Sequence, residues 1–356
     1  MQYLGIDVHS RASVWCLVGA DGEIRARGEV ETTVPALDEL VRKLSSQEAL
    51  RVGQEVGTMA YLVHDAVRGA GAEILSFNAA QLRMIAASRK KTDRRDADWI
   101  ARALQTGLHP HPVYIPTGEV RELRAMLTRR RMIQRDRNRW QYRARAALRG
   151  SGYKIRTGGH SLRKALDSLL STSLGADAQL VELLELCQRQ EGSLTLELAR
   201  AEATLRERVR SIEAISRLQT IPGVGALTAT TIYAWVGDVR RFPNAKALAA
   251  YAGLVPSVRQ SGDVQRLGSI TKTGSKALRS TLVQAAHVTA SRCRSPEAEP
   301  LQAIAERVRG SRGRRKIAIV ALARHLLRIA YYLLRDGTVY EAKRLERSAA
   351  TEPRAA

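Results

Sequence analysis

The sequence predicts an α/β domain at the N-terminus, then a helical coiled-coil insert, then a mainly α C-terminal domain with a helix-hairpin-helix-like motif. Three observations predict this order. Strand and helix patterns alternate over the first hundred residues, a heptad-like leucine series follows, and the last third combines the stretch "IPGVGALTA" with apolar helical patterns. We place the domains at residues 1–115, 116–219 and 220–335, with a flexible tail at 336–356. A chain of 356 residues is long enough for several separate cores.

The N-terminal domain begins with a strand meander. "YLGIDVH" and "SVWCLVGA" are short runs rich in β-branched and aromatic residues, Asp21-Gly22 is a hairpin turn signal, and "EIRARGEVE" alternates with period two. A helix behind Pro35, the strand "LRVGQEV", a helix from about Thr58 to Arg68 and the strand "AEILSF" follow. This order predicts a mixed sheet with helices packed against it.

A further helix should close the N-terminal domain. Thr92 and Asp93 are both good N-cap residues, and the helical pattern continues to Gly107. The proline-rich stretch "LHPHPVYIPTG" then predicts a linker.

The middle region is predicted to be helical. Residues 119–149 contain 11 arginines beside a sparse apolar stripe, and "GSGYKIRTGGH" interrupts the helix. A seam at alternating spacings of four and three follows, formed by Leu180, Leu184, Cys187, Glu191, Leu194, Leu198, Ala201 and Leu205. Such a seam indicates a coiled coil, which a second copy of the chain would complete most simply. The alternative is a hairpin with the arginine-rich helix of the same chain.

The C-terminal region is predicted to be mainly helical, with a loop-rich segment "GLVPSVRQSGDVQRLGSITKTGSK" before the helix "ALRSTLVQAAHVTA". Its most apolar stretch, "KIAIVALARHLLRIAYYLL", is interrupted by Arg324, His325 and Arg328. It is therefore expected to be an amphipathic core helix and not a membrane span.

Charge indicates a polyanionic partner. The net charge is +23, and residues 116–166 carry 15 basic against 3 acidic groups, while residues 220–356 carry 23 against 9. Arginine dominates the first basic region, and its planar fork suits phosphate contacts. The three cysteines show no paired spacing, and the N-terminus has no signal-peptide pattern, so we expect a cytoplasmic protein.

Four carboxylates are candidates for a metal site. Asp7 lies inside an apolar strand, Glu55 ends another, and Asp93 and Asp96 are three residues apart on one predicted helix face. If the first and fourth strands are neighbours, the four side chains converge, and hard oxygen ligands of this kind suit Mg²⁺ or Mn²⁺. Each residue also has a structural alternative: a backbone cap for Asp7, a salt bridge for Glu55 and a helix N-cap for Asp93.

Two further motifs suggest contact with nucleic acid or chemistry on it. In "LQTIPGVGALTA", Gly223 and Gly225 match the turn of a helix-hairpin-helix, whose backbone amides approach a DNA phosphate, although an ordinary glycine-rich connection fits as well. In "RQSGDVQRLGSITKTGSKALR", Ser261 lies among several basic residues. A serine needs such a setting to act as a nucleophile, but Ser269, Thr273 and Ser275 fit the same description.

Four motifs occur in the order of a known family. "GIDVHS", "QEVGT", "KTDRRDA" and "IPGVG…FPNAKALAAYAGLVPSVRQSG…ITKTGSKALR" together resemble the DEDD transposases of the IS110/IS1111 insertion-sequence family, relatives of the Piv-type DNA invertases. The resemblance covers roughly residues 2–335.

The resemblance implies an RNase H-like, RuvC-like N-terminal domain with Asp7, Glu55, Asp93 and Asp96 as Mg²⁺ ligands, and a C-terminal transposase domain with Ser261 as nucleophile. It further implies a phosphoserine link to DNA, a non-coding bridge RNA, and assembly as a dimer or a dimer of dimers. The residues that we expect to contact nucleic acid are Arg129, Arg130, Arg131, Arg135, Arg139, Gly223, Gly225, Arg259, Lys272 and Lys276.

The family commonly continues its glutamate as "EATG", whereas this chain has "EVGT", so the turn after Glu55 is expected to differ. Asp98 is a spare carboxylate, which we place on the solvated face because two residues of helix turn a side chain about 200°.

Three other functions compete with a recombinase. A RuvC-like junction-resolving nuclease would use the same carboxylates to activate water, with Ser261 as a bystander. An ATP-binding protein of the actin type would leave the basic C-terminal region unexplained. A nucleic-acid scaffold would need neither the carboxylates nor the serine.

Overall fold

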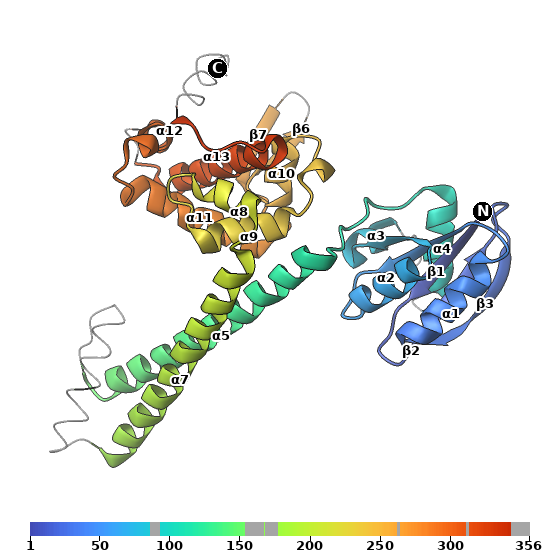
Figure 1. Ribbon diagram of the computed structural model, residues 1–356, viewed down its shortest axis with the longest axis horizontal. Coiled ribbons are helices and arrows are strands. Elements are labelled where there is room, and N and C mark those ends of the chain that lie inside the picture. The colour runs from blue at the N-terminus through green and yellow to red at the C-terminus, as the bar shows by residue number, and fades with distance from the viewer. Residues whose placement is uncertain (86–92, 154–166, 168–176, 262–263, 311–312, 343–356) are drawn as a thin grey trace. The chain divides into compact units, whose positions relative to one another are not determined.

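The computed structural model describes residues 1–85, 93–153, 167, 177–261, 264–310 and 313–342; the side chains of residues 83–95 and 259–267 are outside this description. The chain forms two compact units, Met1–Pro116 and Thr117–Ala356 (Figure 1). The helical middle region therefore belongs to the same unit as the C-terminal domain.

The first unit contains a five-stranded mixed sheet in the order β3-β2-β1-β4-β5. β1 pairs with β2, and β2 with β3, in antiparallel fashion, while β1, β4 and β5 are parallel. The strands are β1 (Gln2–Asp7), β2 (Ala12–Val18), β3 (Ile24–Glu31), β4 (Leu50–Glu55) and β5 (Glu73–Phe77). The first and fourth strands are thus neighbours, which is the condition set for convergence of the carboxylates.

Helices cover both faces of this sheet. The helices are α1 (Val34–Ser45), α2 (Ala60–Gly69), α3 (Ala79–Ile85) and α4 (Asp93–Thr106). Leu4 and Ile6 of β1 are fully buried in a core with α1 and α2. Because strand side chains alternate, residues 3, 5 and 7 face the opposite side, which α4 covers. The sequence predicts α4 well, but the short α3 was not expected.

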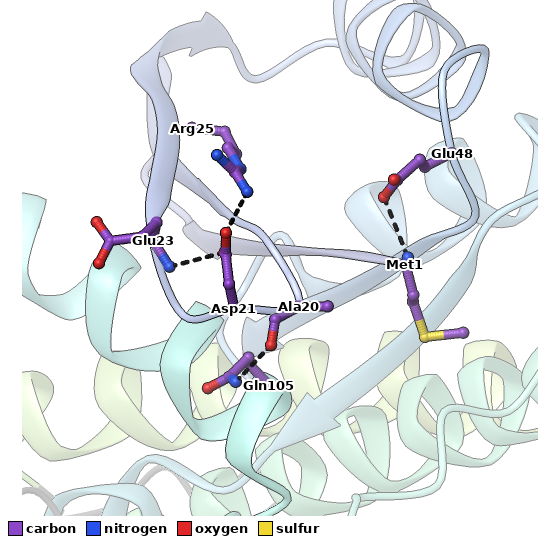
Figure 2. Close-up of polar contacts among 7 residues, drawn as sticks. All are labelled: Met1, Ala20, Asp21, Glu23, Arg25, Glu48 and Gln105. Atoms are coloured by element: carbon purple, nitrogen blue, oxygen red, sulfur yellow. Dashed lines mark hydrogen bonds and ion pairs between the residues drawn. The ribbon is translucent and has the colours of Figure 1, made fainter.

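The C-terminal end of α4 is tied to the β2–β3 turn. The Gln105 side-chain amide donates a hydrogen bond of 3.0 Å to the Ala20 carbonyl oxygen, and Asp21 in the same turn accepts from the Glu23 amide and pairs with Arg25 (Figure 2). The predicted proline-rich linker is attached to the first unit, because the Val113 amide donates a hydrogen bond to the Ser76 carbonyl of β5.

The second unit begins with two long antiparallel helices, α5 (Gly118–Gly150) and α7 (Ala178–Val209), which lie side by side (Figure 1). The seam residues Leu180, Leu184 and Cys187 are buried against Ala144 and Leu148 of α5. The expectation of a second copy as the partner for this seam is therefore wrong. The alternative hairpin within one chain is found, since α5 supplies the apolar stripe that α7 needs.

The C-terminal bundle shares one core of aliphatic side chains. Its elements are α8 (Glu213–Gln219), α9 (Ala226–Val236), η1 (Val239–Arg241), α10 (Ala245–Tyr251), β6 (Pro256–Ser261), β7 (Val264–Ile270), α11 (Lys276–Ser291), η2 (Pro296–Ala298), α12 (Glu299–Arg309) and α13 (Arg315–Asp336). The segment predicted to be loop-rich contains the β6–β7 hairpin, so that expectation is wrong there.

The helix α13 is, within the described residues, the one helix long and apolar enough to cross a membrane. Half of the most apolar part of α13 is buried inside the protein. Leu322, Leu326 and Leu327 are fully buried there. It is therefore the core helix that the sequence indicates. The chain remains anchored beyond it, because the Tyr340 amide donates to the Thr220 hydroxyl and the Tyr340 hydroxyl donates to the Glu297 carbonyl. Tyr340, within the predicted flexible tail, is therefore held by the bundle, and residues 343–356 of that tail lie outside the described residues.

Candidate active site and nucleic-acid interface

Two glycines set the distance between the sheet and α4. Gly5 of β1 and Gly53 of β4 pair directly in the parallel register. A Cβ on Gly5 would overlap the backbone of α4 at Ala97, and a Cβ on Gly53 would meet the Ile100 side chain at 2.7 Å. The backbone of α4 therefore rests directly on Gly5, and side chains of α4 fill the space above Gly53, which residues larger than glycine would prevent.

The same register places two of the predicted carboxylates beside each other. Asp7 and Glu55 each lie two residues after one of the paired glycines, at the last position of β1 and β4. Because side chains two apart share a face, both point to the side that α4 covers. Both residues are partly buried.

The direction of α4 brings its first turn to this edge. Gln105 near its C-terminus bonds at the β2–β3 turn, which lies beside the start of β1 because Val18 pairs with Tyr3. The N-terminal turn of α4, with Asp93 and Asp96, therefore lies toward the carboxyl ends of β1 and β4. Asp96 is partly buried, and the side chain of Asp93 is outside the described residues.

Three elements thus bring Asp7, Glu55 and the helical turn that contains Asp93 and Asp96 toward one edge of the sheet. Among the side chains described, no group of three or more His, Cys, Asp or Glu is close enough to hold a metal ion. The metal-ligand roles consequently remain predictions. The donor set of carboxylate oxygens is nevertheless the one that Mg²⁺ and Mn²⁺ prefer.

Sequence reasoning missed His9 at this edge. Its Nε2 lies 3.3 Å from Asp7 Oδ2, and 44% of its side chain is exposed against 16% for Asp7. The signal was available, because His9 lies two residues after Asp7 in "GIDVHS".

The turn after Glu55 is fixed by buried hydrogen bonds. The Gln54 side-chain amide donates to the Ala60 carbonyl at 3.0 Å and to the Ser76 hydroxyl at 2.9 Å. The Val56 amide donates to the Phe77 carbonyl at 2.9 Å. One further hydrogen bond to β5 thus follows the last residue of β4 before the chain turns into α2.

The expectation that Asp98 lies on a solvated face is wrong, because its side chain is partly buried and paired with Arg27. It accepts hydrogen bonds from Arg27 of β3, at 2.9 Å from the guanidinium Nε, and about a fifth of its side chain is exposed. Burial alone would raise the pKa of Asp98, but hydrogen bonds from Arg27 and Cys16 lower it below its ordinary value. The Cys16 thiol, buried beside this carboxylate, has its pKa raised to about 12, mainly by burial. Asp98 therefore attaches α4 to β2 and β3 and stays apart from the edge with Asp7.

In the second unit, Ser261 is the last residue of β6. It pairs with Val264 of β7, and the hairpin tip at residues 262–263 is outside the description. Two candidates that compete with Ser261 have other contacts. The Ser275 hydroxyl accepts from the Leu278 amide as the N-cap of α11, and the Thr273 hydroxyl donates to Thr271.

The base of this hairpin is interlocked. Gly253 and Gly274 both have positive φ, and a Cβ on Gly274 would overlap the Tyr251 carbonyl. Arg279 donates to the Ala252 carbonyl at 3.1 Å across the same contact. Lys272 and Lys276 are exposed beside it, whereas the Arg259 side chain is outside the description.

The two glycines of the helix-hairpin-helix-like motif differ in their surroundings. Gly223 has φ +85°, and a Cβ there would overlap Thr289 of α11, so internal packing requires this glycine. At Gly225, the N-cap of α9, a Cβ would meet nothing within 4 Å among the described residues. Both glycines line a surface hollow of about 410 Å³. Gly225 is therefore the position where a ligand could approach the backbone.

Comparison with known proteins identifies the family. A family model described as "Transposase IS116/IS110/IS902 family" matches residues 215–302, and a DEDD transposase model named for IS110 matches residues 4–152. A putative transposase of Sinorhizobium fredii is 30% identical over 269 residues, which are 74% of this chain and 67% of that protein. The chain belongs to the IS110 transposase family.

Other relatives match shorter stretches of the chain. The transposase for insertion sequence element IS1111A of Coxiella burnetii is 31% identical over 202 residues, 55% of this chain and 54% of that protein. The pilin gene-inverting protein of Moraxella lacunata is 36% identical over 129 residues, 36% of this chain and 39% of that protein. The chain spans about half the length of the first curated relatives that it matches.

The arginines of α5 that are predicted to contact nucleic acid differ in exposure in this family member. Arg130 points toward α7, where its Nε lies 2.8 Å from Glu202 Oε1. Burial and the neighbouring cations Arg130 and Arg135 lower the pKa of the partly buried Arg131. Arg129, Arg135 and Arg139 are exposed. The exposed arginines are therefore available to a phosphate backbone, since Arg139 has only an exposed ion pair with Asp136, whereas Arg130 is held by Glu202 in a partly buried pair.

Proposed function

We propose that this protein is a metal-dependent DNA recombinase that cleaves and rejoins DNA strands to move its own insertion sequence. One observation carries the proposal. The Gly5–Gly53 pairing puts Asp7 and Glu55 on one edge and one face of the sheet, under the helix turn that contains Asp96. Membership of the IS110 family, with a named transposase and a named gene-inverting protein among its relatives, supports the same function.

The carboxylates at this edge would hold Mg²⁺ or Mn²⁺. Asp7, Glu55, Asp93 and Asp96 are the proposed ligands, on a domain that we take to be RNase H-like. A bound divalent ion supplies charge neutralisation at the scissile phosphate and stabilises the leaving oxygen. The partly buried positions of Asp7 and Glu55 keep these anions out of bulk water, where their attraction for a cation is stronger than at a fully exposed surface.

Ser261 is the proposed nucleophile. Its hydroxyl gives up a proton as Oγ attacks the phosphorus of a DNA phosphodiester, a phosphoserine bond forms, and the P–O bond to the leaving strand end breaks while that oxygen takes up a proton. Attack by the hydroxyl of a different strand end reverses these changes and rejoins the DNA. The interlocked base at Gly253 and Gly274 supports this role, because a rigid base positions the hairpin that contains Ser261.

Nucleic acid is the proposed partner. The exposed arginines of α5, the hairpin residues Arg259, Lys272 and Lys276, and the open backbone at Gly225 are the proposed contacts to DNA and to a non-coding bridge RNA. Assembly into a dimer or a dimer of dimers is also proposed. Because α5 already covers the α7 seam, such an assembly must use other surfaces.

Strand transfer with purified protein tests this function. Full-length protein is incubated with plasmid DNA that contains the element ends, the RNA transcribed from their flanks, and either Mg²⁺ or EDTA. We expect Mg²⁺-dependent recombinant DNA and a covalent protein–DNA adduct. Ser261→Ala should lose both products, while Ser269→Ala, an exposed serine on the same hairpin, should keep them.

Each alternative gives a different result. A junction-resolving nuclease would keep cutting with Ser261→Ala and form no adduct with the wild type. A nucleic-acid scaffold would be unaffected by Asp96→Asn and Ser261→Ala together. Loss of the adduct in Ser269→Ala alone would move the nucleophile to that residue.

A further inference from the structure

One side of α5 faces away from α7. We call it the outer face and define it by its exposed residues Arg129, Met132, Arg135, Arg139, Tyr142, Arg143 and Arg149. At 100° per residue, these positions lie opposite the seam formed by Leu127, Ala144 and Leu148, which are buried. The outer face therefore runs along most of α5 without taking part in the α5–α7 contact.

The outer face is strongly basic. Five of its seven residues are arginines, and the ion pair between Arg139 and Asp136, at 2.8 Å, is exposed on both sides and therefore weak. The neighbouring helix α7 contains six glutamates and four arginines. The hairpin thus has a basic side and a mildly acidic side, and charge complementarity points to a polyanion on the outer face.

Charge does not explain the two apolar residues on this face. Tyr142 is 64% exposed and Met132 is 58% exposed. The Arg145 guanidinium lies 6.0 Å from the centre of the Tyr142 ring, which favours one orientation of that ring. Contacts to the backbone of a duplex need only cations, whereas an exposed aromatic ring among arginines suits the face of an unpaired base.

We propose that the outer face of α5 binds unpaired nucleotides of RNA or DNA, with a base stacked on Tyr142, a second against Met132, and the phosphates on the arginines. The inference deepens the proposed function, on which it rests, by naming single-stranded nucleic acid as the ligand of this surface. Stacking of a base on an aromatic ring does not depend on the sugar. The same contacts could therefore bind a single-stranded RNA loop or a displaced DNA strand.

Binding of short fluorescent oligonucleotides to the full-length protein tests the proposal. The probes are a U20 RNA, a dT20 DNA and a 20-base-pair duplex, measured by anisotropy at several salt concentrations. Tyr142→Ala should weaken single-strand binding about tenfold and leave duplex binding unchanged, because stacking is worth roughly 1–3 kcal/mol per base. Tyr142→Phe should retain wild-type binding, since the ring remains.

Leu196→Ala is the matched control. Leu196 lies on α7 and is 64% exposed, the same fraction as Tyr142. Removal of the Leu196 side chain should leave the affinity for all three probes unchanged. A larger loss for U20 than for dT20 in Tyr142→Ala would assign the face to RNA, and the reverse to DNA; either result supports the proposal.

Three outcomes would overturn the proposal. Unchanged single-strand affinity of Tyr142→Ala would exclude stacking at this ring, and equal losses on single strands and duplex would leave only a general electrostatic or structural role. A changed oligomeric state of Tyr142→Ala with unchanged binding would make the face a protein interface. Absence of binding to all three probes by the wild type would instead count against the proposed function itself.

Discussion

The helices α4 and α5 are both rich in arginine and both lie against a partner element, but the two contacts differ in kind. α4 rests on the sheet through glycines and alanines, so backbone meets backbone at Gly5 and Ala97. α5 meets α7 through leucine side chains and through ion pairs such as Arg130 with Glu202. The first contact leaves the helix little freedom to shift, whereas the second leaves most of the circumference of the helix to solvent.

This difference matches what each helix would have to do. A metal site needs its ligands held within about 0.5 Å, which a close-packed helix on a sheet provides. Binding to a phosphate backbone depends on charge and exposed area and tolerates small displacements. The position of Asp96 should therefore depend on packing, and the contribution of the α5 arginines should depend on exposure.

The largest contrast is expected between two carboxylates on α4. Asp96→Asn should reduce strand cleavage by at least about a hundredfold, the loss typical of disturbing even the outer partners of a metal ligand. Its unfolding free energy should stay near the wild-type value, because the partly buried side chain changes little in size. Cleavage assays measure the predicted loss of activity, and urea unfolding measures the predicted constancy of the unfolding free energy. Unchanged cleavage by Asp96→Asn would show that Asp96 is not a metal ligand.

Gly5→Ala probes the close contact of α4 with the sheet. The added Cβ would overlap the Ala97 carbonyl, so α4 must move, and we expect a loss of about 3 kcal/mol of unfolding free energy, as in overpacked cores. Gly57→Ala is the control, because a Cβ there meets nothing within 4 Å among the described residues. Urea unfolding of both variants checks this. Equal stability of the two would mean that the contact is looser than the structure indicates.

Asp98→Asn should have a smaller effect with a specific pH dependence. The variant loses the charged bond to the half-exposed Arg27, which, discounted for solvent screening, is worth about 1 kcal/mol near neutral pH. Since folding lowers the pKa of Asp98 below 3.8, this stability is present above that pH and is lost as the pH falls through the folded value. The difference from wild type should therefore shrink in acid.

Urea unfolding at a series of pH values measures that difference. Asp38→Asn, which breaks an exposed pair with Arg42 on α1, is the control and should cost less at every pH. A difference for Asp98→Asn that stays constant into acid would show that the carboxylate acts through shape and not through charge.

Much of the first unit could be predicted from local signals. The period-two alternation of β3, the turn at Asp21-Gly22 and the helical pattern of α4 are short-range features, and each is found where expected, although the predicted N-cap Thr92 lies outside the described residues. The shared face of Asp7 and Glu55 required one further fact, the β1–β4 pairing, which strand order alone does not reveal. The role of Asp98 depended on Arg27, 71 residues away, which helix periodicity does not reveal.

The second unit shows a different limit of sequence reasoning. The heptad pattern of α7 marks residues that are buried, such as Leu180 and Leu184, but it does not decide between a second copy of the chain and α5 as the helix that covers them. The β6–β7 hairpin was missed because glycine, serine and lysine dominate its sequence and give a weak strand signal. The assignment of Ser261 as the nucleophile therefore depends on the family resemblance more than the assignment of the carboxylates as metal ligands does.

The smallest expected effect separates two adjacent arginines of α5. Arg129→Gln should weaken duplex DNA binding only a few-fold and lower the slope of log affinity against log salt by about 0.9, the value for one lost phosphate contact. Arg130→Gln should leave that slope unchanged and cost about 1 kcal/mol of unfolding free energy, because Glu202 loses its partner. Anisotropy titrations and urea unfolding give the two numbers for each variant. If Arg130→Gln lowered the slope and Arg129→Gln the stability, exposure would not decide which arginines of α5 meet the nucleic acid.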